Sequence, residues 1–152
     1  MKSFIITVAA VMFIATASYS QKIEESKVPT AVKAAFKNKF PQAVKASWEM
    51  EKKDYEVNFS LDNRQLSANF SPVGKWLETE TAVELSKLPK AVSGALAEQF
   101  AGYTVKEADL VEAPGKAAVY EVDVVKGKES LELQFSEKGE LLKKEVAGKE
   151  ED

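Results

Sequence analysis

The stretch VPTAVKAAFKNKF, from Val28 to Phe40, decides the fold because the chain repeats it sixty positions later as LPKAVSGALAEQF, from Leu88 to Phe100. In both copies the apolar residues recur at i, i+4, i+7, i+8 and i+12, which predicts one apolar stripe along an amphipathic helix. A proline opens each copy, where its missing N–H costs nothing. In the first copy Pro41 ends the predicted helix, because a proline disfavours helical dihedral angles in the residue before it.

The segments after each helix alternate apolar and polar residues, which predicts β-strands. Tyr55-Glu56-Val57 returns sixty-five positions later as Tyr120-Glu121-Val122. Asp62-Asn63 is typical of a two-residue hairpin loop, and Ser71–Gly74 is typical of a second turn. The sequence therefore predicts an α+β fold of two tandem repeats, each one helix packed on a four-stranded antiparallel meander. We expect the two sheets to be adjacent or continuous, with both helices on one side.

These patterns divide the chain into a signal peptide (1–20), a flexible lead-in (21–27), a first repeat (28–80), a joint (81–87), a second repeat (88–147) and a charged tail (148–152). The signal peptide is predicted from a short basic start, an apolar run from Phe4 to Ala17, and small residues before a cleavage site after Ser20. The apolar run is shorter than the roughly 20 residues that span a bilayer. We therefore expect a periplasmic or secreted protein with no membrane span after cleavage.

The amino-acid composition excludes several classes of function. The chain has 21 Lys and Arg against 24 Asp and Glu, a net charge of −3, and neither histidine nor cysteine. Nucleic-acid binding is disfavoured because it needs a clustered basic face. Triads of Ser-His-Asp type and Cys-His pairs are excluded, as are disulfides. No motif indicates a cofactor or a metal, although a weak surface calcium site stays open as an alternative. Glu78 and Glu80 share one face of a predicted strand, and a solvated face is a better interpretation of them than a catalytic pair. We expect no enzymatic activity.

The aromatic residues are the best candidates for a binding role. Trp48 and Trp76 both lie in the first repeat, and most of the aromatic side chains are expected in the core. Trp76 and Leu77 have opposite faces, so one of them is expected outside the core. An exposed aromatic side chain between Lys75 and Glu78 would be an interface anchor. The candidate partner-binding residues are Trp48, Trp76, Leu77, Lys75 and Glu78.

Several of these pieces together resemble the PepSY-like, beta-lactamase-inhibitor-like family of small exported bacterial proteins. They are the two helix openings, Phe40-Pro41-x-Ala43, Trp48-Glu49, Tyr55-Glu56-Val57, and Gly74-Lys75-Trp76-Leu77-Glu78-Thr79-Glu80. The resemblance covers Val28 to Glu145 and implies the tandem fold and an exported location. The second repeat departs from the first because it has no Trp where the first has Trp48 and Trp76.

We therefore expect a non-enzymatic exported module that binds an envelope protein or peptide through the open sheet face, with aromatic anchors and a Lys/Glu rim. Two alternatives stay open: a proteinaceous inhibitor of a hydrolase, either a beta-lactamase or a protease, and a small-molecule or calcium binder. A closed apolar pocket between helix and sheet would favour a small-molecule ligand. Edge strands of two copies could also pair with each other.

Overall fold

A single antiparallel sheet of nine strands forms the protein, and the strands follow one another in the sheet in their order along the chain. The computed structural model describes residues 21–147. The strands are β1 (Gln21–Ile23), β2 (Val44–Glu51), β3 (Asp54–Leu61), β4 (Arg64–Phe70), β5 (Trp76–Ala82), β6 (Thr104–Glu112), β7 (Val119–Lys126), β8 (Glu129–Phe135) and β9 (Leu141–Val146). The expectation of an α+β fold is confirmed, and the two sheets are one continuous sheet.

Two ten-residue helices stand at corresponding places in the chain. Helix α1 (Thr30–Lys39) precedes β2–β5, and α2 (Lys90–Gln99) precedes β6–β9. Pro29 and Pro89 are the residues immediately before them. In both helices the last turn closes in the same way, since the N–H of Phe40 bonds to the carbonyl of Phe36 and the N–H of Phe100 to that of Leu96.

The segment before the first helix is more regular than the sequence suggested. We expected a flexible lead-in over 21–27, but Gln21–Ile23 forms β1, which pairs with Trp48–Met50. A 3-10 turn follows at Glu25–Lys27. The lead-in is mostly polar, and Ile23 is the one apolar residue of β1, so no alternation of apolar and polar residues marks this strand. Its partner β2 supplies the backbone groups with which it pairs. The predicted signal peptide and the charged tail lie outside the described residues.

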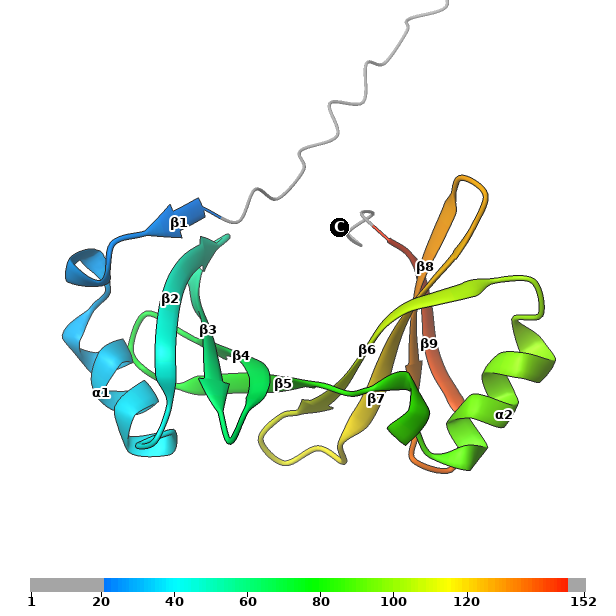
Figure 1. Cartoon of the computed structure of the whole chain (residues 1–152). Helices are drawn as coiled ribbons and strands as arrows, with labels where there is room; N and C mark the ends of the chain where they lie inside the picture. Colours follow the sequence, from blue (N-terminus) through cyan, green and yellow to red (C-terminus); the bar gives the residue numbers. More distant parts are fainter. Residues whose placement is uncertain (1–20, 148–152) are drawn as a thin grey trace, which may run out of the picture.

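The apolar side chains form two clusters, one under each helix. The first includes Val32, Trp48, Phe59 and Phe70, and the second includes Val92, Leu96, Val124 and Phe135. Both clusters lie on the same side of the sheet, because one cross-strand row runs from Leu66 of the first cluster through Thr81 and Leu110 to Tyr120, which packs on the second. The sheet bends between β5 and β6, so the two helices lie on the outside and the opposite face of the sheet is turned inward between two lobes (Figure 1).

The same glycine turn holds the start of each helix. Gly74, between β4 and β5, has φ of +81°, and Gly139, between β8 and β9, has φ of +79°. A Cβ on Gly74 would lie 2.6 Å from the carbonyl oxygen of Ala31 in α1, and one on Gly139 would lie at least as close to that of Ala91 in α2. Only glycine meets both demands, positive φ and close approach. The repeated turn therefore fixes each helix against its own strands.

Candidate binding face

The polar residues of the strands point away from the helices and meet across the sheet. Each strand is two-faced, so burying Val57, Ala68, Val122 and Leu133 under the helices places their chain neighbours on the opposite face. Cross-strand pairing then brings acidic side chains next to one another, since Asp109 lies opposite Glu121 and Glu107 lies opposite Asp123. The continuous sheet adds Glu80 on β5, at the junction of the two repeats.

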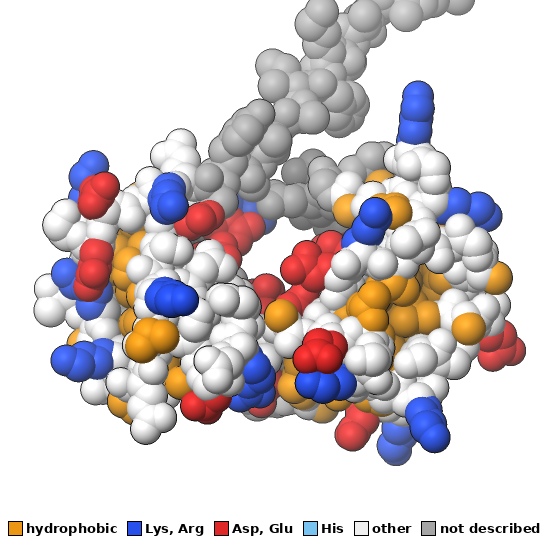
Figure 2. Space-filling model, in the orientation of Figure 1, with side chains coloured by type: hydrophobic (Ala, Val, Ile, Leu, Met, Phe, Trp, Pro, Cys, Tyr) orange, Lys and Arg blue, Asp and Glu red, His pale blue; other side chains and the backbone are white. Residues whose placement is uncertain are grey.

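These side chains surround a hollow of about 290 Å³ at the centre of the open face. Its lining contains six carboxylates and no lysine or arginine; we call these six the acidic face: Glu56, Glu80, Glu107, Asp109, Glu121 and Asp123. They come from β3, β5, β6 and β7, so both repeats contribute. Figure 2 shows red acidic side chains gathered in the space between the two lobes.

Burial raises the pKa values of most carboxyls on this face. The pKa of Glu80 rises from 4.5 to about 7, chiefly because the side chain is desolvated and secondly because Glu121, Glu78 and Asp109 are close. The pKa of Asp109 rises from 3.8 to about 6, by burial first and then by the charges of Glu107, Glu121 and Asp123. Burial also raises the pKa values of Glu56, Glu121 and Asp123. The acidic face therefore gains negative charge as the pH rises through neutrality.

Neutral side chains donate hydrogen bonds to carboxylates on and beside the acidic face. Ser67 Oγ donates to Glu80 Oε2 at 3.1 Å, Gln134 Nε2 donates to Glu121 Oε2 at 2.9 Å, and Asn69 Nδ2 donates to the neighbouring Glu78 Oε1 at 3.0 Å. These donors orient the carboxylates without neutralising them. The charge of the face is therefore set by the pH and the raised pKa values of its carboxyls, and not by a basic side chain in the lining.

The residues predicted for partner binding do not form one surface. Trp48 is 3% exposed and lies in the first core cluster, against the edge of the Phe36 ring. Trp76 is half-buried on the helix side; its Nε1 donates to Thr79 Oγ1 at 2.9 Å, and Lys39 Nζ lies 3.4 Å from its ring centre. Leu77 is half-buried and Lys75 is exposed. Of the five, Glu78 is the one that lies beside the acidic face.

The expected aromatic anchors on the open face are therefore replaced by carboxylates. Trp48 lies on the same face of the sheet as the core residues, so its side chain faces the helix. The sequence shows the acidic positions as the polar residues of alternating strands, which by itself predicts a solvated side chain for Glu80. What the sequence did not reveal is which strands lie side by side, and hence that six acidic side chains share one hollow.

Residues 21–147 contain no group of three or more Asp and Glu side chains placed to hold a metal ion together. Neither helix of this part of the chain has the length and apolar character needed to cross a membrane.

The chain belongs to a family described as "Putative beta-lactamase-inhibitor-like, PepSY-like", whose model matches residues 14–66 and 53–143. The resemblance noted in the sequence is thereby confirmed. None of the curated proteins matches the sequence.

Solved structures share the fold across most of their length. A BLIP-like protein from Bacteroides fragilis is 28% identical, with a TM-score of 0.71, over 82% of this chain and 89% of that one. A DUF2874 family protein from Bacteroides ovatus is 26% identical, with a TM-score of 0.72, over 79% and 88% of the two chains. A protein from Bacteroides eggerthii described as "putative periplasmic" is 25% identical, with a TM-score of 0.73, over 78% and 88%.

Proposed function

We propose that this protein is a non-enzymatic exported module that binds a protein or peptide through the open face of its sheet, and that its partner presents a cationic segment. The observation that carries the proposal is the acidic face, six carboxylates around one hollow with no basic side chain among them. Membership of a beta-lactamase-inhibitor-like family supports a binding role. A predicted signal peptide and the periplasmic description of one relative support an exported location.

A cationic partner is favoured by the energetics of the free face. Asp109 and Glu121 face each other across adjacent strands, and like charges placed directly opposite are destabilising. A lysine or arginine side chain inserted between them relieves that repulsion while forming charge-assisted hydrogen bonds. Electrostatic complementarity of this kind contributes mainly to specificity and to the rate of association.

The test compares a triple variant, Glu80→Gln, Asp109→Asn and Glu121→Gln, with the unchanged protein. Binding of a lysine-rich peptide and of an otherwise identical glutamine-rich peptide is measured by calorimetry at two salt concentrations. We expect the unchanged protein to prefer the lysine-rich peptide, to bind it more weakly in high salt, and to lose the preference in the triple variant. The same variant used as bait for envelope proteins should lose the partners that the unchanged protein retains.

The matched control removes three acidic charges elsewhere: Glu24→Gln, Glu84→Gln and Glu98→Gln, all exposed. It has the same net charge as the triple variant. Equal loss of binding in both variants would show that net charge, rather than the acidic face, attracts the peptide and would overturn the proposal.

A second candidate function is inhibition of a hydrolase, which the BLIP-like name of one relative favours. An inhibitor presents rigid loops, and the Asp62-Asn63 hairpin turn is held with φ of +51° and +61° between the paired residues Leu61 and Arg64. Rates of beta-lactamases and envelope proteases measured with excess protein test this function. Unchanged rates across the whole panel would reject it.

A further inference from the structure

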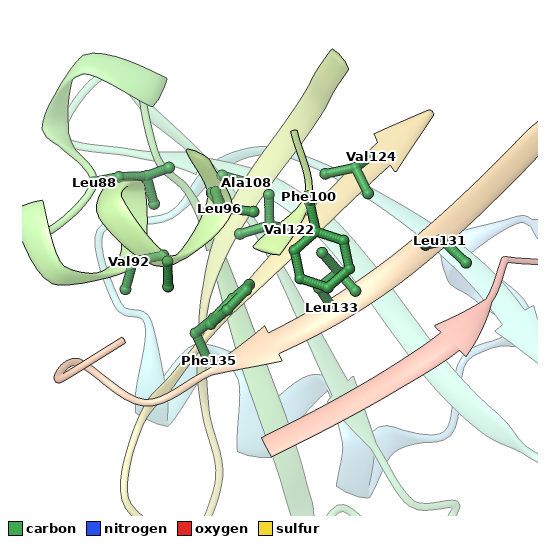
Figure 3. Packing of buried hydrophobic residues seen from close by; sticks show 11 residues of the cluster. Leu88, Val92, Leu96, Phe100, Ala108, Val122, Val124, Leu131, Leu133 and Phe135 are labelled. Atoms are coloured by element: carbon green, nitrogen blue, oxygen red, sulfur yellow. The ribbon is translucent and has the colours of Figure 1, made fainter. Parts of the chain in front are cut away.

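A second hollow lies on the helix side of the sheet, in the second repeat. It has a volume of about 330 Å³ and opens between α2 and the strands β6 and β7. Its walls include Leu88, Leu96, Phe100, Val105 and Val124. Hydrophobic side chains are visible over this part of the right-hand lobe in Figure 2. In Figure 3, Leu88 and Leu96 on the α2 side lie opposite Val124 on its strand.

The hollow exists where the second repeat has smaller side chains than the first. In the first repeat, the Phe36 ring packs on Phe59 at 5.1 Å and on Trp48 at 5.4 Å between ring centres. The positions that match Phe36 and Phe59 hold Leu96 and Val124. Ala108 takes the place of Trp48, because Ala108 pairs with Val122 as Trp48 pairs with Val57. Three large aromatic groups are thus absent from the second helix–sheet interface.

The rim of this hollow carries one basic and one phenolic group. Lys126 Nζ lies 3.6 Å from where a Cβ on Gly102 would stand, and 5.5 Å from the centre of the Tyr103 ring. The Tyr103 hydroxyl donates to Glu129 at 2.5 Å. That bond engages Glu129, which lies opposite Lys126 across β7 and β8, and Lys126 forms no ion pair among the residues described. The ammonium group of Lys126 is therefore available to bind the anionic group of a ligand at the rim.

We propose that this hollow is a binding site for a small amphiphile with an apolar body and a carboxylate head. An apolar cavity of about 150 Å³ holds benzene, so one roughly twice that size accommodates a body of about ten carbon atoms. The apolar walls bind the body, and Lys126 binds the carboxylate. The site lies on the opposite side of the sheet from the acidic face, so it is independent of the function proposed above.

Octanoate is a suitable probe, with 1-octanol as its uncharged counterpart. The full mature chain, labelled at its Leu and Val methyl groups, is titrated with each while methyl NMR spectra are recorded. We expect shifts at Leu88, Leu96, Val105 and Val124, and none at Val57 and Leu66 of the first repeat. Absence of shifts at the second-repeat methyl groups would overturn the proposal, as would equal shifts in both repeats.

Substitutions in the protein then test separately how the apolar body and the carboxylate head of the ligand are bound. Val124→Phe fills the hollow with the residue that the first repeat has, and Ala97→Phe covers its mouth from the exposed surface of α2 without altering the core. Both should abolish octanoate binding, whereas Val73→Phe, at a position 80% exposed in the first repeat, should not. Octanoate binding that survives both substitutions in folded protein would overturn the site.

Lys126→Gln tests the head group. It should weaken octanoate binding about two- to fivefold, the range of an exposed ion pair, and leave 1-octanol binding unchanged. An equal effect on both ligands would show that Lys126 does not bind the carboxylate.

Discussion

Gly74 and Gly139 each combine a positive φ with a close approach to a helix carbonyl, so neither position accommodates a side chain. Alanine at either position adopts a left-handed backbone at a cost of about 1–2 kcal/mol, and its Cβ also displaces the first turn of a helix. We expect Gly74→Ala and Gly139→Ala each to lower the free energy of unfolding by more than this backbone cost, as measured by urea denaturation.

The control is Gly94→Ala, inside α2, where a Cβ would meet nothing within 4 Å. That substitution should stabilise the protein by up to about 1 kcal/mol, because alanine has the higher helix propensity. If all three substitutions change stability alike, the close approach of the turns to the helices does not matter.

Glu80 makes stability depend on pH in the direction opposite to most carboxylates. Its pKa is about 7 in the folded protein and 4.5 ordinarily, so the folded state binds the extra proton between these values. Its contribution to stability is therefore fully present below pH 4.5 and is lost as the pH rises through about 7. We expect the melting temperature of Glu80→Gln to exceed that of the unchanged protein at pH 8, and the difference to shrink at pH 5.

Glu137→Gln, in an exposed turn, is the matched control for the loss of one carboxylate, and its melting temperature is measured at the same two pH values. A Glu80→Gln variant that melts no higher than the unchanged protein at pH 8 would contradict the assignment.

At the scale of elements, one side-chain contact ties the end of α1 to the start of β5. Lys39 Nζ lies 3.4 Å from the centre of the Trp76 ring. We expect Lys39→Ala to lower the free energy of unfolding by about 0.5–1 kcal/mol, the usual range of a cation–π contact. Lys37→Ala is the control, since both lysines lie in the last turn of the helix and interact alike with its dipole. Equal effects of the two substitutions would show that the ring contact contributes nothing.

The elements themselves could largely be predicted from the sequence, because helix and strand periodicities are local properties. Val28 to Phe40 shows its stripe without reference to other residues, and Asp62-Asn63 shows its hairpin because both residues tolerate positive φ. Strand β1 escaped prediction because its three residues are too few to show an alternation of apolar and polar side chains, and they are ordered by pairing with β2. Pairing between distant segments leaves no periodic signal in the shorter of them.

At the scale of the whole molecule, the nine strands join two separate hydrophobic clusters. No described residue belongs to both clusters, and the repeats meet through the four paired positions of β5 and β6. We expect Trp48→Ala to destabilise the first repeat by about 3–5 kcal/mol while the amides of Val122 and Leu133 stay protected from hydrogen exchange. Ala108→Gly is the matching change in the second repeat and should spare Val57. Loss of protection in both repeats after either change would show that the sheet unfolds as one unit.

The candidate site could be predicted only in part, and the reason lies at this largest scale. Glu80 and Asp109 are twenty-nine positions apart, and only the β5–β6 pairing brings their strands together. A comparison of the two repeats draws attention to the aromatic residues that differ between them, and so it favours Trp48 as a binding residue. The carboxylates gather at the junction of the repeats, where neither copy alone contains the pattern.

The bend of the sheet between β5 and β6 couples the binding of a partner to the angle between the two lobes. Whatever occupies the hollow beneath this bend touches both lobes, so its free energy of association depends on the angle between them. By thermodynamic reciprocity, a change that opens or closes the angle alters affinity without touching a contact residue. Binding of a partner in the hollow would then change the bend at the β5–β6 pairing. Energy transfer between two fluorophores placed on α1 and α2 would measure this change as a change in the distance between the helices.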